Sequence, residues 1–184
     1  MSVVTKTGDD GYTDIIGGER LRKDHPIIEC LGTIDELNAF LGDAKAALGI
    51  GDQGIGNYAD IITGIQKDLF LLMGILAGMP VPENGMGSPS LDGTGRIDQL
   101  ITDLESKLPP VTSFAIPGAN PASAKLHIAR AVCRRAEREL IGFSLGEKTK
   151  AAVVPYINRL SDLLFLLAQK AHNDMSLNST EHYR

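Results

Sequence analysis

Arginine is concentrated in one short segment in the second half of the chain. Arg130, Arg134, Arg135 and Arg138 fall within nine residues that contain no lysine, and Glu137 lies among them. The guanidinium group is a rigid fork of N–H donors that matches the oxygens of a phosphate or a carboxylate. The bias toward arginine therefore favours a polyanion site, although a solvated or ion-paired helix face would give a similar run of charge.

A second group of anion-binding residue types lies near the N-terminus, in the sequence TKTGDDGYT from Thr5 to Thr13. Gly8 and Gly11 allow the backbone to bend so that successive amides converge, while Lys6 and the threonine hydroxyls add donors. The segment differs from the nucleotide P-loop because no Gly-Lys pair occurs in the chain. It fits either an anion-binding loop or an ordinary surface turn.

More cations follow this loop at Arg20, Arg22 and Lys23. They come before any strong helix signal. We therefore predict that residues 1–25 form an ordered arm and not an element of the core.

The central arginines must be positioned by a helix, and the sequence marks where it starts. Asn120 can cap the first free amides, and Pro121 suits the first helical position. Apolar residues then recur at spacings of three and four and form one stripe, made of Leu126, Ala129, Cys133, Ala136 and Leu140. An adjacent stripe of the same helix carries the charged residues Arg130, Arg134, Glu137 and Arg138.

Four further helices are predicted from apolar periodicity. Thr33 followed by Glu36 matches a capping box and predicts a helix from there to about residue 48. The others are predicted over 58–77, 95–108 and 150–173, with a Gly- and Pro-rich loop over 78–95. Residues 174–184 are expected to be a polar tail that frays. The fold class is therefore all-α, with one domain over 1–184 whose helical bundle spans 26–173.

Several polar and aromatic residues have two interpretations from the sequence alone. Asp35 lies in the first turn of its predicted helix, where the helix dipole favours a carboxylate, but an arginine partner would also explain it. Phe114 lies just before the arginine helix, where core or lid packing is usual. On the last helix Asn158 and Phe165 share a stripe, which places a polar side chain near an aromatic ring. His127 is either a surface histidine or a neighbour of the site.

Composition and charge restrict the function classes. The net charge of -5 and the pI near 5.3 argue against a general nucleic-acid or membrane-surface binder, which needs a basic face. Cys30 and Cys133 have no metal-ligand spacing, which indicates reduced, buried thiols and suits a cytoplasmic location. The N-terminus lacks the apolar core of a secretion signal. The longest apolar run, Leu69–Val81, is shorter than the ~20 residues that span a bilayer.

Three blocks of the sequence together resemble the PduO-like corrinoid adenosyltransferases, which use ATP to adenosylate cobalamin. The blocks are TKTGDDGYT with GGERLRKD, then GTIDELNAFLG, and finally FAIPGANPASAKLHIARAVCRRAER followed by YINRLSDLLF. They cover most of the chain outside residues 50–110. The resemblance implies a bundle of five helices assembled as a homotrimer, with ATP bound between neighbouring subunits. It also implies Mg²⁺ with the ATP and cobalamin as a substrate.

The resemblance assigns ATP contacts to both parts of the chain. In the arm they are Thr5, Lys6, Thr7, Gly8, Thr13 and Lys23. In the bundle of the neighbouring subunit they are Arg134, Glu137, Arg138 and Asn158. Two positions depart from the family pattern, because Asp10 stands where many relatives carry lysine and Asp14 stands where a hydroxyl is common.

The same resemblance assigns residues to the corrinoid and to the subunit interface. Asp35 and Arg130 look like the family's intersubunit ion pair. Phe114 matches the aromatic residue that closes the lower face of the corrin, and Phe165 matches one that lines that pocket. His127 is expected beside it. With Arg134 and Glu137, the residues Asp35, Arg130 and Phe114 form the predicted catalytic set.

The reaction that this resemblance implies is displacement at the 5′ carbon of ATP by cobalt(I), with triphosphate leaving. Cobalt(I) is itself a strong nucleophile, so the protein's tasks are alignment and charge stabilisation. The departing charge would be met by Mg²⁺, the arm amides, Lys6, Lys23, Arg134 and Arg138. Glu137 would orient Arg134 or a ribose hydroxyl, and Phe114 would keep an axial ligand away from cobalt(II).

Two other function classes are alternatives for a helical bundle. A ferritin-like di-metal oxidase needs Glu-x-x-His pairs, and the sequence contains none. A non-catalytic helical module that senses ATP is the more serious alternative, and it would bind nucleotide without forming a product. A corrinoid reductase and an adenosylcobalamin-dependent enzyme would be natural partners of a transferase. The sequence assigns no protein ligand to Mg²⁺.

Overall fold

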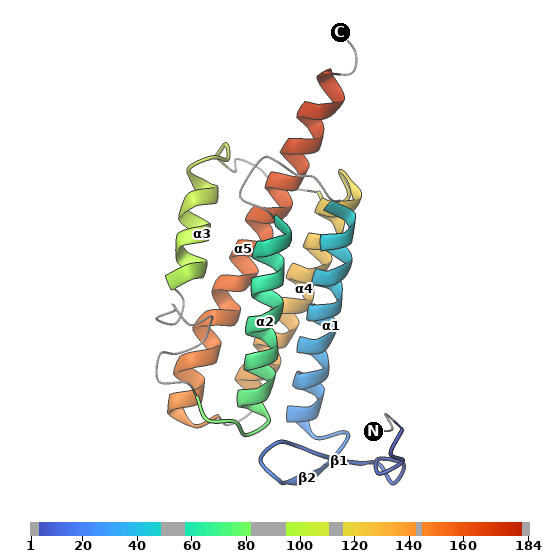
Figure 1. Ribbon diagram of the computed structural model, residues 1–184. Coiled ribbons are helices and arrows are strands. Elements are labelled where there is room, and N and C mark those ends of the chain that lie inside the picture. Colours follow the sequence, from blue (N-terminus) through green and yellow to red (C-terminus); the bar gives the residue numbers. More distant parts are fainter. Residues whose placement is uncertain (1–3, 49–57, 82–94, 111–115, 143–144, 182–184) are drawn as a thin grey trace.

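The computed structural model describes residues 4–48, 58–81, 95–110, 116–142 and 145–181. These ranges contain β1 (Tyr12–Asp14), β2 (Arg20–Arg22), α1 (Pro26–Leu48), α2 (Tyr58–Leu76), α3 (Gly95–Glu105), α4 (Pro121–Gly142) and α5 (Glu147–Glu181). The five helices run side by side, and the small sheet of the arm lies at one end of the bundle (Figure 1). The predicted all-α bundle with an ordered N-terminal arm is confirmed.

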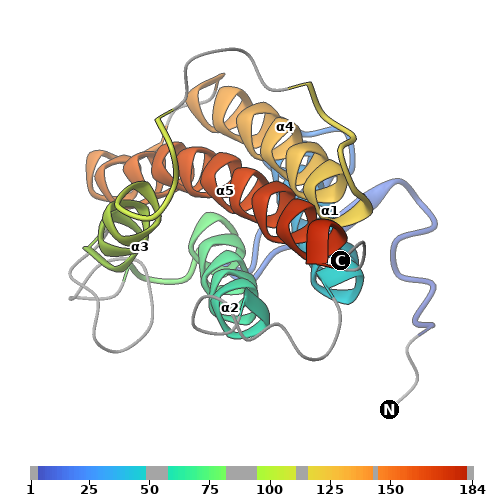
Figure 2. The ribbon, with the colours of Figure 1, turned by 90° about the horizontal axis from the view of Figure 1, so that it is seen from above.

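α4 packs against both α5 and α1, and α5 lies between α4 and the outer helix α3 (Figure 2). α2 packs against α1, and α3 lies outside the others and packs against α5 (Figure 2). The apolar stripes predicted from the sequence meet in one core, with Leu37, Leu41, Leu69, Leu126 and Leu164 fully buried. Since burying one such side chain is worth about 1.5–3 kcal/mol, these stripes hold the helices in register.

The predicted start of the first helix at Thr33 is wrong, because α1 begins at Pro26. His25 caps the helix: its Nδ1 accepts from the backbone N–H of Ile27 at 3.2 Å, and its carbonyl accepts from Ile28 at 2.8 Å. Pro26 suits the first helical position because its missing N–H has no partner there anyway. Thr33 is a buried residue inside the helix. Asp35 therefore lies mid-helix, and the dipole interpretation of its carboxylate fails.

The start of α4 agrees with the prediction. The side-chain oxygen of Asn120 accepts from the backbone N–H of Ser123 at 2.8 Å, which is the expected cap. Its amide also donates to the carbonyl of Ala171 at 3.1 Å. The cap residue therefore fixes α4 against α5 as well as starting the helix.

The last helix is longer than predicted at both ends. It begins at Glu147, not at Lys150, and the backbone N–H of Lys150 already donates to the carbonyl of Gly146 at 2.9 Å. It continues to Glu181, so the tail predicted to fray over 174–184 is helical to that residue. Neither Gly nor Pro occurs after Asp174, and Asp174 is held by the hydroxyl of Tyr58 at 3.0 Å. The helix also runs through Pro155.

The outer helix α3 is fixed by its first turn. The guanidinium of Arg96 lies on α2 directly over Gly64, where a Cβ atom would collide with it. It also faces the buried carboxylate of Asp68 at 3.9 Å, and that carboxylate accepts from the hydroxyl of Tyr156 on α5 at 2.9 Å. Burial and the neighbouring Asp68 hold the pKa of Tyr156 well above its usual value. Arg96 thus ties α3 to α2, and Asp68 of α2 is in turn bonded to α5.

One described helix is long and apolar enough, by length and composition alone, to cross a bilayer. It is the part of α5 from Glu147 to Asp174, not the run over 69–81 considered from the sequence. Of the most apolar 18-residue stretch of this helix, 56% is buried inside the bundle. Such burial is typical of the core helix of a helical domain.

Candidate functional site

The arm presents its polar residues through two tight turns. The backbone N–H of Asp9 donates to the carbonyl of Lys6, and that of Gly11 donates to the carbonyl of Gly8, each at 3.3 Å. Lys6 has a left-handed φ of 60°, which is uncommon for a residue with a side chain. The hydroxyls of Thr5 and Thr7 lie 3.0 Å apart, and Thr5, Lys6 and Thr7 are all exposed. Three side chains predicted to bind ATP therefore gather at one turn.

Gly8 and Lys23 are in contact across the arm. The Nζ atom of Lys23 lies 2.9 Å from where a Cβ atom at Gly8 would be, and the carbonyl oxygen of Tyr12 lies 3.3 Å from the same point. The backbone N–H of Lys23 donates to the carbonyl of Gly11 at 2.9 Å. The absence of a side chain at position 8 thus places a cation directly on the turn, as an anion-binding loop requires.

Arg20 organises the arm, and sequence reasoning did not assign it this role. Its guanidinium donates to the carboxylate of Asp10 at 2.8 Å, to the carbonyl of Thr7 at 2.9 Å and to Asp14 at 3.4 Å. The hydrogen bond from Arg20 holds the pKa of the Asp10 carboxyl below its ordinary value. The two positions that depart from the family pattern, Asp10 and Asp14, are therefore the two acidic partners of one arginine. The sequence gives one indication of this arrangement, which is that Asp10 and Asp14 lie close to Arg20 along the chain.

On the bundle, the predicted ATP residues of α4 and α5 lie together. The side-chain amide of Asn158 donates to the carboxylate of Glu137 at 2.8 Å. Arg134, one turn before Glu137, and Arg138, the residue directly after it, are exposed. Within the described ranges neither arginine forms an ion pair or hydrogen bond, so both guanidinium groups are available to an anion.

The neighbouring arginines have other environments. Arg135 forms an ion pair with Glu36 of α1 and so ties α4 to α1 inside the chain. Arg130 is half-buried, and its Nε is buried with no hydrogen-bond partner in the part of the chain that is described. Asp35 is exposed on α1. Among the described residues no ion pair joins Asp35 to Arg130.

The predicted corrinoid residues are only partly covered by the structure. The rings of His127 and Phe165 are 6.1 Å apart between centroids and tilted by 60°. His127 is buried, and burial together with the charge of Arg130 lowers the pKa of its imidazole. Its Nδ1 has no hydrogen-bond partner among the described residues. Phe114 lies outside the described residues.

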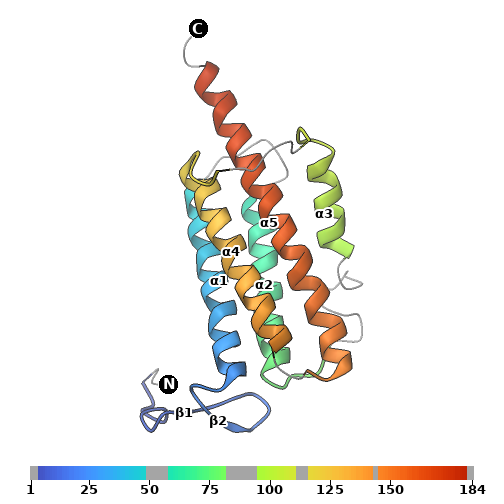
Figure 3. The same cartoon turned by 180° about the vertical axis from the view of Figure 1, so that it is seen from behind.

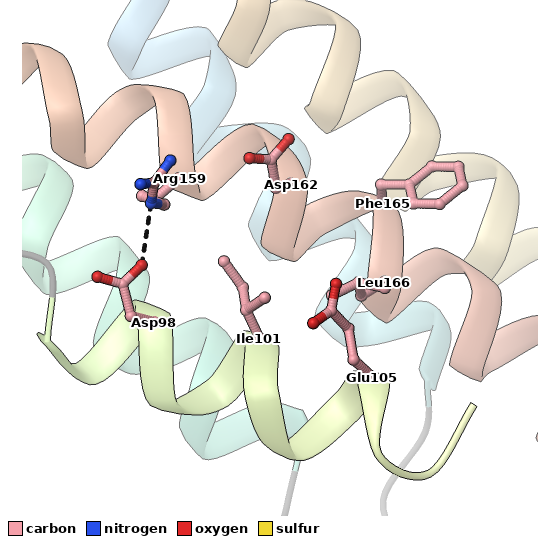
Figure 4. A pocket seen from close by; sticks show the side chains of 7 residues that line it. All are labelled: Asp98, Ile101, Glu105, Arg159, Asp162, Phe165 and Leu166. Atoms are coloured by element: carbon pink, nitrogen blue, oxygen red, sulfur yellow. Dashed lines mark hydrogen bonds and ion pairs between the residues drawn. The ribbon is translucent and has the colours of Figure 1, made fainter. Parts of the chain in front are cut away.

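A cavity of about 380 Å³ opens between α3 and α5, next to Phe165 (Figure 4). Its apolar lining consists of Ile101, Phe165 and Leu166, and its polar lining consists of Asp98, Glu105, Arg159 and Asp162. Nε of Arg159 lies 3.0 Å from the carboxylate of Asp98 and so joins the two helices. Among the residues that line this cavity, only Phe165 is a predicted site residue. The sequence does not predict the contribution of α3, because nothing in it indicates which helix packs on α5.

Among the described residues, the two halves of the predicted ATP site are not joined to each other. The arm lies below the N-terminal end of α1 (Figure 3), and it bonds to the end of α2, where the backbone N–H of Gly17 donates to the carbonyl of Ala77 at 2.8 Å. No hydrogen bond or ion pair among the described residues connects its Thr5, Lys6 or Lys23 with the α4 arginines. The described residues also include no cluster of three or more His, Cys, Asp or Glu side chains that could hold a metal ion.

Comparison with known protein families gives a match over most of the chain. The family model described as "Cobalamin adenosyltransferase" matches residues 3–171. Corrinoid adenosyltransferase PduO of Citrobacter freundii is 35% identical over 182 residues, which cover 97% of this chain and 52% of that protein. The corrinoid adenosyltransferase of Bacillus subtilis (strain 168) is 35% identical over 100% of this chain and 93% of its own length. The chain spans about half the length of the two PduO relatives it matches.

Solved structures agree with the sequence comparison. A phenylalanine-to-alanine variant of PduO-type ATP:corrinoid adenosyltransferase from Lactobacillus reuteri, complexed with cobalamin and ATP, has a TM-score of 0.80 and 29% identity. The match covers 95% of this chain and 96% of that one. An arginine-to-lysine variant from the same organism, complexed with ATP, has a TM-score of 0.78 at the same identity and coverage.

Proposed function

Since the chain belongs to the cobalamin adenosyltransferase family, we propose that it transfers the 5′-deoxyadenosyl group of ATP to cob(I)alamin. The products would be adenosylcobalamin and triphosphate. The observation that carries this proposal is the arrangement on α4, where the exposed Arg134 and Arg138 flank the bond between Glu137 and Asn158. This arrangement offers two guanidinium forks to a polyphosphate and an oriented polar pair to a nucleoside.

The proposed reaction requires the protein to stabilise charge and does not require a protein nucleophile. Cobalt(I) supplies both electrons of the new cobalt–carbon bond, the bond from the 5′ carbon to oxygen breaks, and triphosphate leaves with that electron pair. Negative charge grows on the triphosphate in the transition state. Preorganised donors such as Lys6, Lys23, Arg134 and Arg138 would stabilise it, each by about 2.7–4 kcal/mol.

Two adjacent arginines provide a matched test of this assignment. Arg134→Ala should lower kcat/KM for ATP by about two to three orders of magnitude, because a free guanidinium is lost. Arg135→Ala should change it only a few-fold, because that guanidinium is already held by Glu36. Equal losses in the two variants would contradict the assignment. Nucleotide binding with no triphosphate released would instead favour a module that senses ATP.

Mg²⁺ would enter with the nucleotide. Magnesium commonly binds through substrate phosphates with one or two carboxylates at most. The described residues offer no group of three acidic, histidine or cysteine side chains, which fits a cation held mainly by the triphosphate. Bound in that way, it would neutralise part of the charge that the leaving group gathers.

We further propose that the active unit is a homotrimer with sites between subunits. The arm residues and the α4 residues make no bond to one another within the described chain, which supports a site completed by a neighbour. Asp35 of one subunit would pair with Arg130 of the next. Asp35→Arg should weaken assembly in analytical ultracentrifugation, and combining it with Arg130→Asp should restore it. A wild-type monomer that is fully active would contradict this arrangement.

For the corrinoid we propose contacts from Phe165, His127 and Phe114. The contact between the His127 and Phe165 rings supports a shared apolar surface. Phe114 would exclude an axial ligand from the lower face of cobalt(II), so Phe114→Ala should impair the reductant-coupled reaction far more than ATP binding. Equal losses in both would count against it. A cytoplasmic location, with a reductase and an adenosylcobalamin-dependent enzyme as partners, completes the proposal.

A further inference from the structure

The cavity between α3 and α5 carries an excess of negative charge. Three carboxylates and one guanidinium line it. Arg159 is paired with Asp98 at 3.0 Å, so that acid is compensated. Glu105 and Asp162 are exposed, and among the described residues neither forms a hydrogen bond or an ion pair. Two acceptor-only groups therefore remain available to a ligand.

The rest of the cavity is apolar. Ile101 of α3 and Leu166 of α5 line it between the helices, and Phe165 lies at the end nearer to α4 (Figure 4). In the same view Glu105 rises from α3 toward α5, and Asp162 lies on α5 between Arg159 and Phe165. A volume of about 380 Å³ is at the lower end of small-ligand sites and would hold part of a larger molecule. The lining therefore fits a ligand whose edge is apolar and carries hydrogen-bond donors.

The edge of a cobalamin ring has these properties, because its acetamide and propionamide side chains end in neutral NH₂ donors. A corrinoid whose side chains are free acids would instead place carboxylates beside Glu105 and Asp162. Like charges across an interface are a common means of rejecting a wrong partner. We propose that Glu105 and Asp162 are specificity-determining residues that admit corrinoids with an amidated periphery and disfavour those with free carboxylates.

This inference rests on the proposed function, since it assumes that a corrinoid reaches Phe165. The test compares cobinamide, whose ring side chains are amides, with cobyrinic acid, whose side chains all end in carboxylates. Dissociation constants are measured by calorimetry with ATP and Mg²⁺ present, for the full chain. In the wild-type protein the dissociation constant for cobyrinic acid should exceed that for cobinamide by roughly tenfold or more. Added salt should reduce this ratio of dissociation constants.

Two neutral substitutions then locate the effect. Glu105→Gln and Asp162→Asn should each narrow the ratio by roughly two- to fivefold, as expected for exposed charges. Asp103→Asn is the matched control, since it removes the same charge from α3 at an exposed residue outside the cavity that accepts from Gln99 at 2.8 Å. It should leave the ratio unchanged.

Three results would overturn the inference. The first is a wild-type protein that binds cobinamide and cobyrinic acid equally well. The second is a ratio of dissociation constants that Glu105→Gln and Asp162→Asn leave unchanged. The third is a ratio that Asp103→Asn narrows as much as those two variants do. The salt dependence of the wild-type ratio gives an answer even if a variant misfolds. Adenosylation of cobinamide that has been chemically reduced to its cobalt(I) form, assayed separately with the same proteins, ATP and Mg²⁺, reports on the proposed function, which would stand if product forms without any selectivity between the two ligands.

Discussion

The side-chain amide of Asn158 donates to the carboxylate of Glu137 at 2.8 Å, joining α5 to α4 between two exposed arginines. The carbonyl oxygen of the same amide accepts from Arg159 at 3.5 Å. Both ends of Asn158 are therefore oriented, and the negative charge of Glu137 is held near Arg134 and Arg138 without occupying either. A polar pair fixed in this way can position a nucleoside while the arginines bind its phosphates.

We expect Glu137 and Asn158 to act as one unit. Glu137→Ala and Asn158→Ala should each lower kcat/KM for ATP by roughly tenfold or more, because a hydrogen bond to a charged group is worth about 1.5–3 kcal/mol. The double variant should be little worse than either single one. Steady-state kinetics on the four proteins, with thermal unfolding to check folding, measures this. Additive losses would mean that the two residues act independently.

Gly8 should be intolerant of a side chain for a functional reason. A Cβ atom there would lie 2.9 Å from Nζ of Lys23, so Gly8→Ala should move that ammonium off the turn. We expect KM for ATP to rise roughly tenfold, as for loss of one charged contact, with little change in the thermal midpoint. Gly42→Ala is the control, since a Cβ atom there meets only Gln66 at an ordinary 3.5 Å. Unchanged KM in Gly8→Ala would contradict the role of this contact.

Arg20 should hold the arm in shape without stabilising the bundle. Its acidic partners are exposed, so Arg20→Ala should leave the unfolding midpoint of the helices unchanged but speed proteolytic cleavage of the arm several-fold. Arg22→Ala should not speed cleavage of the arm, because Arg22 pairs only with the nearby Asp24 within the described arm. An arm equally protected in both variants would show that Arg20 is dispensable.

The same contact has a pH dependence of known sign. The pKa of Asp10 is lowered from its ordinary 3.8, mainly by the hydrogen bond from Arg20. The ionised Asp10 carboxylate therefore stabilises the folded arm fully above pH 3.8. This stabilisation is lost as the pH falls through the lower pKa that Asp10 has in the folded arm. Protection of the arm from an acid-active protease should fall in that range, and Asp10→Asn should abolish the change.

The two cysteines should be inert until the bundle unfolds. Cys30 and Cys133 are buried, and burial raises the pKa of Cys30 to about 12 from an ordinary 9.0. Because only the thiolate reacts, iodoacetamide at pH 8 should label neither residue in native protein and both in denaturant. Stability should decline as the pH rises from 9 toward 12, where only the unfolded state ionises. Rapid native labelling would contradict this burial.

The sequence was a good guide where the signal was local. Asn120 and Pro121 start α4 as predicted, and the stripe from Leu126 to Leu140 is buried as expected, because caps and periodicity depend on neighbouring residues alone. The start of α1 was missed since Thr33 and Glu36 imitate a capping box, while the true cap is His25, an unusual residue for that position.

Contacts between distant segments could not be predicted. Arg20 and Asp10 meet across the arm, and the pairing of Glu137 with Asn158 depends on how α4 and α5 rotate against each other. The contribution of α3 to the cavity depends on Arg96, which docks where Gly64 leaves α2 bare. Helical spacing shows which residues share a face, but the packing of whole helices decides which faces meet.

Transfer of the adenosyl group is tested most directly by an anaerobic reaction of the purified chain with ATP, Mg²⁺ and chemically reduced cobalamin. The absorption spectrum of cob(I)alamin should be replaced by that of adenosylcobalamin. One molecule of intact triphosphate should be released for each cobalt–carbon bond, and the Arg134→Ala protein should be slowed by about two orders of magnitude or more. A spectrum that stays unchanged while ATP is bound would contradict it.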